Sequence, residues 1–227
     1  MSPDDSRDPA HRDNGHEAAG AAAFVPETED LEALRAAAAD CQGCELFRDA
    51  TQTVFGRGAP RARLALVGEQ PGDVEDERGA PFVGPAGRLL VQAIDEAGID
   101  RDQIWVTNAV KHFRFTVRGT RRIHQTPDAV HIAACKPWLS AELRSVAPDV
   151  VVCLGATATR ALLGTTVRVM RDRGVVLERD TSLGTKRFLV TVHPSAILRT
   201  PDADRPSAYA ALVSDLRVAA AALQLLG

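Results

Sequence analysis

The chain has 227 residues, a length compatible with one α/β domain or with two small ones, and its 45% hydrophobic and 25% charged residues are ordinary for a globular protein with a core. With 27 Lys and Arg against 30 Asp and Glu, its net charge of −3 excludes a globally basic nucleic-acid-binding protein, so such binding would need a local patch. The chain lacks an apolar run of membrane-spanning length, and its polar start is unlike a signal peptide; we therefore expect a cytoplasmic protein that does not bind membranes.

The N-terminal segment, residues 1–27, is rich in Asp, Gly, Ala and Pro and has no periodicity, which predicts a disordered tail. A single domain is expected over residues 28–227. It begins with a helix that runs toward Cys41, because an acidic first turn is followed by strong helix formers.

The rest of the chain alternates short apolar runs with helical stretches. Strands are predicted at 62–68, 103–110, 149–155 and 187–194, and helices at 84–99, 126–146, 155–164 and 207–226. This alternation predicts a three-layer α/β/α single domain around a central, mainly parallel four-stranded sheet with right-handed crossovers.

Polar residues stand at the ends of three predicted strands: Glu69 follows the first, Asn108 ends the second and His193 ends the fourth. The carboxyl ends of strands in an open parallel sheet form one ligand-binding edge. We expect these side chains to converge there as a site; the alternative is that each only caps its strand.

The chain has four cysteines, and two of them, Cys41 and Cys44, form a C-x2-C pair that can reach one metal from a single turn. Cys135 falls in a predicted helix and Cys153 in a predicted strand. Spacing alone leaves zinc and an iron–sulfur cluster both open, and it also allows the last two thiols to be ordinary core residues.

The most basic segment lies between two of these elements. From Gln103 to Pro127 the chain has no acidic residue, and five cations alternate with aromatics. We interpret about 111–125 as an inserted basic loop that binds a phosphate backbone and ends on His124. The alternative is an exposed loop packed by its own aromatics.

Six motifs occur in order behind the C-x2-C pair: GEQPG (68–72), APFVGPAGRLL (80–90), VTNAVKHFRF (106–115), RRIH (121–124), LGATA (154–158) and HPSAILR (193–199). Together they resemble the uracil-DNA glycosylase superfamily, from residue 38 to about 226. The cysteine layout resembles its iron–sulfur branch, family four. Gln in the first motif and an Arg-rich loop ending in His are most similar to the UdgX group.

The resemblance implies an activity and a cofactor. The protein would excise uracil from DNA in a single turnover, with His124 capturing the deoxyribose C1′ in a stable covalent adduct. A mainly structural [4Fe-4S] cluster would be held by Cys41, Cys44, Cys135 and Cys153. We expect a monomer that binds uracil-containing DNA, single strands included, and releases free uracil.

The chemistry of uracil excision suits the residues in these motifs. A flipped base needs a stacking face, here Phe82, and an edge-reading amide, here Asn108. The turn of Gly68 and Gln70 is expected to bind the base as well, since glycine permits close approach.

Excision also needs catalytic groups, for which His193, Glu69 and His124 are the candidates. His193 is expected to stabilise charge on uracil O2, and Glu69 to orient His124 and accept its proton. Attack requires neutral imidazole, so capture should weaken below about pH 6.

DNA contacts are expected from the same motifs. The residues in question are Arg121, Arg122, Ser195, Leu198 and Arg199, with the Leu-Arg pair as a wedge in the base stack. One departure from the UdgX pattern is Thr120, where that group usually has Lys.

Two other functions fit parts of the pattern. One is a conventional multiple-turnover glycosylase in which Glu69 activates water and the loop only binds DNA. The other is a non-catalytic nucleic-acid-binding module with structural zinc. A nucleotide-binding enzyme is disfavoured because neither G-x-G-x-x-G nor a P-loop occurs.

Overall fold

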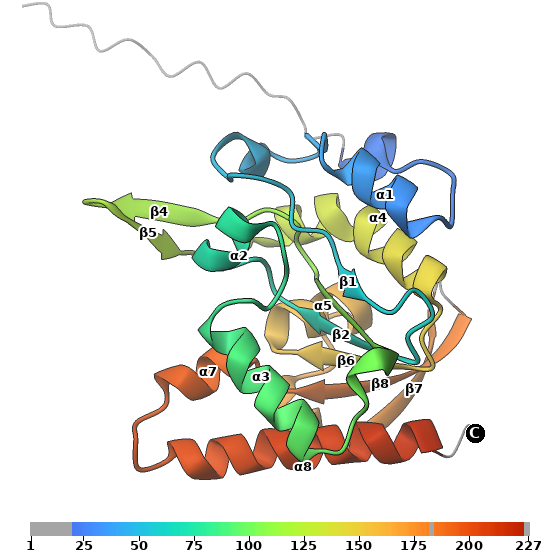
Figure 1. The fold of residues 1–227 in the computed structure, drawn as a ribbon, viewed down its shortest axis with the longest axis vertical. Coiled ribbons are helices and arrows are strands. Elements are labelled where there is room, and N and C mark those ends of the chain that lie inside the picture. Colours follow the sequence, from blue (N-terminus) through green and yellow to red (C-terminus); the bar gives the residue numbers. More distant parts are fainter. Residues whose placement is uncertain (1–19, 182–183, 225–227) are drawn as a thin grey trace, which may run out of the picture.

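The computed structural model describes residues 20–181 and 184–224, and its centre is a six-stranded sheet (Figure 1). The strand order is β1-β3-β2-β6-β8-β7. The strands are β1 (Arg57–Gly58), β2 (Leu64–Gly68), β3 (Ile104–Asn108), β6 (Val150–Leu154), β7 (Val176–Thr181) and β8 (Gly184–Thr191).

The inner four strands, β3, β2, β6 and β8, run parallel and are the four strands predicted from the sequence. The α/β class and the mainly parallel sheet are therefore confirmed. Two antiparallel edge strands, β1 and β7, extend this core. They were not predicted because β1 has two residues and β7 is polar and only partly buried, so neither has an apolar pattern.

Helices cover both faces of the sheet. They are α1 (Leu31–Ala38), α2 (Asp73–Arg78), α3 (Pro85–Glu96), α4 (Ala129–Val146), α5 (Ala156–Leu163), α6 (Val169–Asp172), α7 (Pro194–Arg199) and α8 (Arg205–Gln224). Short 3-10 helices occupy Ala21–Phe24, Glu45–Arg48 and Arg101–Gln103. In Figure 1, α1 and α4 lie on one side of the sheet and α3 and α8 on the other, as three layers require.

The core divides into two clusters, one on each face of the sheet. Alternate residues of β2 separate cleanly, since Ala65 and Val67 pack with Trp138 of α4 while Leu64 and Leu66 pack with Leu216 of α8. Strands buried on both faces are continuous apolar runs, which is why their positions could be predicted.

The ordered domain starts earlier than predicted. Residues 20–27, assigned to the tail from composition, include the 3-10 helix Ala21–Phe24, which packs against α4. Ala21 is only 2% exposed, and its backbone lies so close to Gly43 that any side chain there would collide. Close packing thus gives residues 20–27 a defined structure, although their sequence has no hydrophobic periodicity from which it could be predicted. The rest of the predicted tail, residues 1–19, lies outside the described residues.

The basic insertion is a two-stranded antiparallel hairpin, β4 (Phe115–Arg118) with β5 (Arg121–His124), which projects from the domain (Figure 1). Its tight turn places Gly119 at φ 63°, a left-handed conformation that glycine adopts without strain. We call this hairpin the arm. Phe115 pairs with His124, so His124 lies at the base of the arm, next to the domain.

In the part of the chain that the structure describes, every helix is too short or too polar to cross a bilayer.

Candidate active site

The carboxyl ends of the parallel strands converge, as predicted. Gly68 pairs with Asn108 across β2 and β3, and backbone hydrogen bonds of 2.9 Å and 3.0 Å join Ala109 and Val110 to the residues that end β2. A cavity of about 240 Å³ opens at this edge. It is lined by Gln70, Gly72, Glu75, Phe82, Ala86, Asn108, His124, His193, Ser195 and Arg199.

We call Gly68, Phe82, Asn108 and His193 the rim, and its parts are tightly fitted. A Cβ on Gly68 would stand 2.4 Å from Asn108 Oδ1 and 2.6 Å from Phe82 Cζ, so only glycine fits there. Phe82 adopts φ 56°, a strained value for a bulky residue, and its ring centroid lies 5.9 Å from that of His193. The surrounding structure therefore holds Phe82 in a strained conformation beside the cavity.

Asn108 has a free recognition edge. Its side chain is nearly buried and lines the cavity, yet within residues 20–181 and 184–224 its amide makes no hydrogen bond to protein. Its backbone oxygen instead accepts from Lys111 Nζ at 2.7 Å. The amide donor and acceptor are therefore both available to a ligand.

His193 is fixed in one tautomer by the start of α7. The Ser195 N–H donates to His193 Nδ1 at 3.1 Å, so Nδ1 accepts and the proton of the neutral ring lies on Nε2. Burial, together with the nearby His124 and Arg199, lowers the pKa of His193 to about 4. At neutral pH the ring is an uncharged Nε2–H donor on a wall of the cavity.

The arm is joined to the domain at its base by Gln70. Its side-chain NH₂ donates to the carbonyls of Arg114 and Gln125, at 3.1 Å and 3.0 Å, and its oxygen accepts from the Arg114 N–H at 3.0 Å. Gln70 was predicted to bind substrate. It lines the cavity, but its polar atoms are occupied by the arm.

A second attachment uses Arg122. Its guanidinium lies 2.5 Å from Asp73 and 2.6 Å from Asp76, both on α2, and 5.1 Å from the ring centroid of Phe115. Asp76 is fully buried, so removing Arg122 would leave a buried carboxylate without its cation, which is costly. Arg122 was predicted to contact DNA; the structure uses its charge to dock the arm on α2.

These attachments place His124 beside Glu69. The two side chains approach to 3.4 Å between His124 Nε2 and Glu69 Oε1, and the His124 ring packs near Phe113. Burial lowers the pKa of His124 below 6.5; the Glu69 charge opposes this shift and the Arg199 charge adds to it. The imidazole is therefore mainly neutral at pH 7 and keeps a lone pair, although its side chain is 46% exposed.

His124 also lines a second cavity, of about 630 Å³, on its other side. The two cavities share Gln70, His124, His193, Ser195 and Arg199. Glu69 and the start of α5 contribute to the second cavity alone. His124 is therefore among the residues that separate the space beside the rim from a larger neighbouring cavity.

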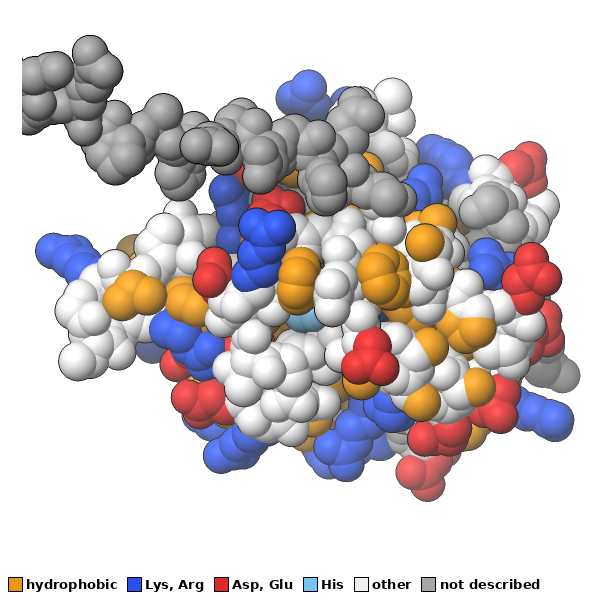
Figure 2. Space-filling view, turned by 90° about the horizontal axis from the view of Figure 1, so that it is seen from above, with side chains coloured by type: hydrophobic (Ala, Val, Ile, Leu, Met, Phe, Trp, Pro, Cys, Tyr) orange, Lys and Arg blue, Asp and Glu red, His pale blue; other side chains and the backbone are white. Residues whose placement is uncertain are grey.

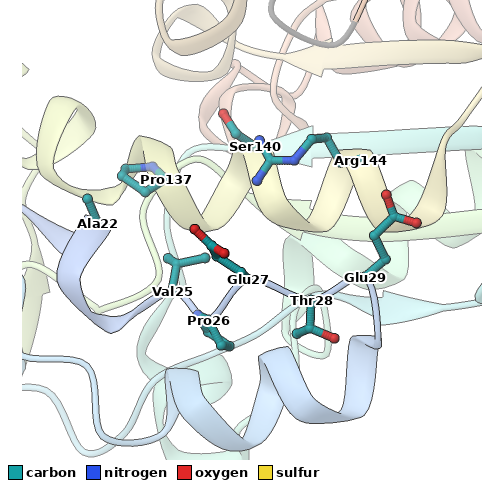
Figure 3. Close-up of a pocket in the computed structure, with 9 residues that line it drawn as sticks. All are labelled: Ala22, Val25, Pro26, Glu27, Thr28, Glu29, Pro137, Ser140 and Arg144. Atoms are coloured by element: carbon teal, nitrogen blue, oxygen red, sulfur yellow. The ribbon is translucent and has the colours of Figure 1, made fainter.

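A further cavity of about 640 Å³ lies elsewhere, between residues 25–29 and α4 (Figure 3). Figure 3 shows Pro137, Ser140 and Arg144 of α4 facing the segment that carries Glu27 and Glu29. None of the predicted site residues lines this cavity. Its position argues against a role in the chemistry of the rim.

The basic segment contributes fewer free cations than its sequence suggests. Lys111 is completely buried and pairs with Glu142 at 3.0 Å, and Arg114 pairs with Asp128 at 2.7 Å. Arg118 and Arg121 remain exposed on the arm. Figure 2 shows acidic and basic side chains interspersed over one face, with Lys or Arg at the projecting end on the left. Within the basic segment, the exposed cations are thus Arg118 and Arg121 of the arm.

The last predicted DNA contacts lie on α7, next to His193. Ser195 Oγ hydrogen-bonds to His193 Nδ1 at 2.8 Å and accepts from Arg199 at 3.2 Å. Leu198 is 37% exposed, an apolar side chain presented to solvent beside the site. The structure therefore brings Ser195 and Arg199 to the cavity, with Leu198 on the same helix, and the contacts of all three with DNA stay a prediction.

Sequence reasoning missed four residues that shape the site. Glu75 lines the smaller cavity and accepts from the Gly84 N–H at 2.7 Å, which ties α2 to the start of α3. Thr157 donates its hydroxyl to Glu69, and Asp73 and Asp76 hold Arg122. The signal for Asp73 and Asp76 was the acidic helix that follows GEQPG, because the arginines of a basic segment can form ion pairs with nearby carboxylates.

The four cysteines are free and buried in one hydrophobic cluster. N–H groups point at two of the sulfurs: Trp138 Nε1 lies 3.1 Å from Cys41 Sγ, and the Lys111 N–H lies 3.2 Å from Cys135 Sγ. Iron–sulfur thiolates commonly receive such hydrogen bonds, so the donor set fits a cluster in type and surroundings. Across residues 20–181 and 184–224, however, no three Cys, His, Asp or Glu side chains are arranged as a closed ligand set.

Comparison with known proteins gives consistent matches. The family model for the "Uracil DNA glycosylase superfamily" matches residues 55–217. The type-4 uracil-DNA glycosylase of Thermotoga maritima is 38% identical over 160 residues, covering 70% of this chain and 78% of that protein. Those of Sulfurisphaera tokodaii and Pyrobaculum aerophilum are 33% and 31% identical, covering 77% and 76% of this chain and 78% and 86% of theirs.

Proposed function

This chain belongs to the uracil-DNA glycosylase superfamily, and we propose that it excises uracil from DNA and captures the resulting sugar on His124. The product would be a covalent protein–DNA adduct in the manner of the UdgX group, formed in a single turnover by a monomer. The observation that carries this proposal is the 3.4 Å approach of the His124 imidazole to Glu69, at the edge of a cavity lined by Phe82 and Asn108.

The rim suits cleavage of the glycosidic bond. Phe82 offers a stacking face, and the free amide of Asn108 matches the N3–H and O4 of uracil. The C1′–N1 bond breaks and its electron pair leaves with the base. The Nε2–H of neutral His193 then stabilises the charge that develops on uracil O2.

The arm suits capture of the sugar. The lone pair of neutral His124 forms a bond to C1′, replacing the bond to uracil N1. The carboxylate of Glu69 accepts the proton that the imidazole carries on its other nitrogen. Water is thereby replaced as the nucleophile, and the protein is consumed.

The test uses a labelled single-stranded oligonucleotide with one uracil, mixed with the protein, heated in SDS and run on a denaturing gel. We expect a heat-stable shifted band that is specific to uracil and absent with thymine or cytosine. His124→Ser should abolish the band and leave alkali-labile cleavage at the uracil position.

The other outcomes assign the rival functions. Alkali-labile cleavage by the unaltered protein without a shifted band would mean a conventional multiple-turnover glycosylase. Neither product, from protein that binds the oligonucleotide, would leave a nucleic-acid-binding module. Either result would overturn covalent capture.

We also propose that a [4Fe-4S] cluster is held by Cys41, Cys44, Cys135 and Cys153. The support is chemical: four buried free thiols in one apolar cluster, two of them receiving N–H hydrogen bonds. Such a cluster would hold α1 and α4 to the sheet rather than act on DNA. Broad absorbance near about 400 nm, with iron and sulfide in equal amounts, would support it. A colourless protein with stoichiometric zinc would contradict it.

A further inference from the structure

The Glu69 carboxylate has a second partner besides His124. Thr157, the second residue of α5, donates its hydroxyl to Glu69 Oε2, while the other oxygen, Oε1, faces His124. Thr157 is 6% exposed. It lies in the LGATA motif, but no role was predicted for it from the sequence. One carboxylate is thus held from both sides.

The sheet explains why these two residues meet. β2 and β6 are neighbours, with Val67 opposite Cys153, so both strands end at the same edge. The chain then turns through Gly155 into α5, and the Thr157 hydroxyl reaches the carboxylate that follows β2. Thr157 is therefore fixed by the sheet and not by the arm.

From this arrangement we propose that Thr157 is a positioning residue, which fixes the rotation of the Glu69 carboxylate so that one oxygen faces His124. The terminal torsion of a glutamate side chain is broad and weakly restrained. A hydroxyl bonded to one oxygen removes that freedom and aims the other. This inference rests on the proposed capture chemistry and assigns one of its supporting contacts.

The test compares Thr157→Val, which keeps the shape but loses the hydroxyl, with Thr157→Ser, which keeps the hydroxyl. Thr159→Val is the matched control, because Thr159 is also buried on α5 but donates to the Gly155 carbonyl at 2.8 Å. A thermal melt of each variant checks that all three are folded.

Two readouts separate positioning from general damage. The first is the single-turnover rate of the SDS-stable adduct, which we expect to fall about 10- to 100-fold in Thr157→Val, as for loss of a hydrogen bond to a charged group. Thr157→Ser and Thr159→Val should remain within about threefold of the unaltered protein.

The second readout is the titration of the His124 imidazole, followed by NMR in the DNA-free protein. The Glu69 charge raises the pKa of His124, so a carboxylate that turns away should let that pKa fall further in Thr157→Val. It should be unchanged in the other two variants. This measurement does not depend on the reaction.

A slower adduct with an unchanged His124 titration would overturn the proposal, as would a shifted titration with an unchanged rate. Thr157→Val behaving like Thr159→Val in both readouts would do so as well. If the unaltered protein forms no adduct, the proposed function fails separately, and the titration still reports whether Thr157 aims Glu69.

Discussion

The rim and the arm meet at one cavity, but they are held in place by different forces. Three rim residues stand at or just after the ends of β2, β3 and β8, where main-chain ladders fix them, and Phe82 packs so closely that even a methyl on Gly68 would collide. The arm is a separate two-stranded sheet, and the side chains of Gln70 and Arg122 dock it on the domain. The proposed recognition of the base would thus depend on backbone geometry, and the proposed capture would depend on polar contacts that single substitutions can remove.

The largest effect is expected from Gly68→Ala, which should disrupt the packing of the rim. Its Cβ would stand 2.4 Å from Asn108 Oδ1 and would displace the recognition amide. We expect uracil excision to fall by about 100-fold or more, since small displacements of a reacting group are costly. Single-turnover release of uracil measures this effect in a His124→Ser background. Excision within a few-fold of that background would show that the fit around Gly68 is unimportant.

The arm is best released by Arg122→Met. This change leaves the buried Asp76 without its cation and removes the contact with Phe115, so the arm should lose its orientation. We expect adduct formation to slow about 10- to 100-fold while uracil release changes much less.

The neighbouring Arg121→Met serves as the control, because Arg121 is exposed on the same strand. It should weaken DNA binding in a salt-dependent way without slowing capture at saturating DNA. Equal effects of the two substitutions on capture would remove the distinction between a docking arginine and a DNA-facing one.

Both regions should lose activity in acid, but at different pH values. Capture needs neutral His124, whose pKa lies below 6.5, so the adduct rate should be flat above about pH 6.5 and fall up to tenfold per pH unit once that pKa is passed. Burial is the largest cause of the low pKa of His193 and remains in His124→Ser, so uracil release by that variant should continue to lower pH, although loss of His124 removes one of the smaller causes. Parallel acid limbs in single-turnover assays would contradict this separation.

The smallest effect is expected at the tip of the arm. Thr120 is exposed there and is the one departure noted above from the UdgX pattern, which usually has Lys at this position. Thr120→Lys should tighten DNA binding about two- to threefold at low salt and steepen the salt dependence by about one counterion. A capture rate that changed at saturating DNA would mean that the tip also influences the chemistry.

The sequence predicts the rim better than the arm, for a physical reason. Runs such as Leu64–Gly68 are apolar on both faces, so strand positions and the convergence of their ends follow from pattern alone. The edge strand β7 was not predicted, because most of its side chains are polar.

The partners of the arm escaped prediction for a different reason. Arg122 and Asp73 are 49 positions apart, and nothing local distinguishes a docking arginine from the exposed Arg121 beside it. Lys111 looked like part of the basic surface, but it is buried against Glu142. The catalytic and DNA-contact roles assigned from the motifs stay predictions, although the structure gathers most of those residues around one cavity.

The two ends of the arm lie close together, so the arm could be removed or replaced as one unit. Its flanking residues, Arg114 and Gln125, are already joined by a backbone hydrogen bond of 2.9 Å, so the chain leaves the domain and returns at nearly one point. A short turn could close that gap without moving β3 or α4. On the proposed mechanism the nucleophile therefore belongs to a segment that can be removed or transferred as a unit, and a host protein would need a glutamine and an acidic helix in matching places to dock it.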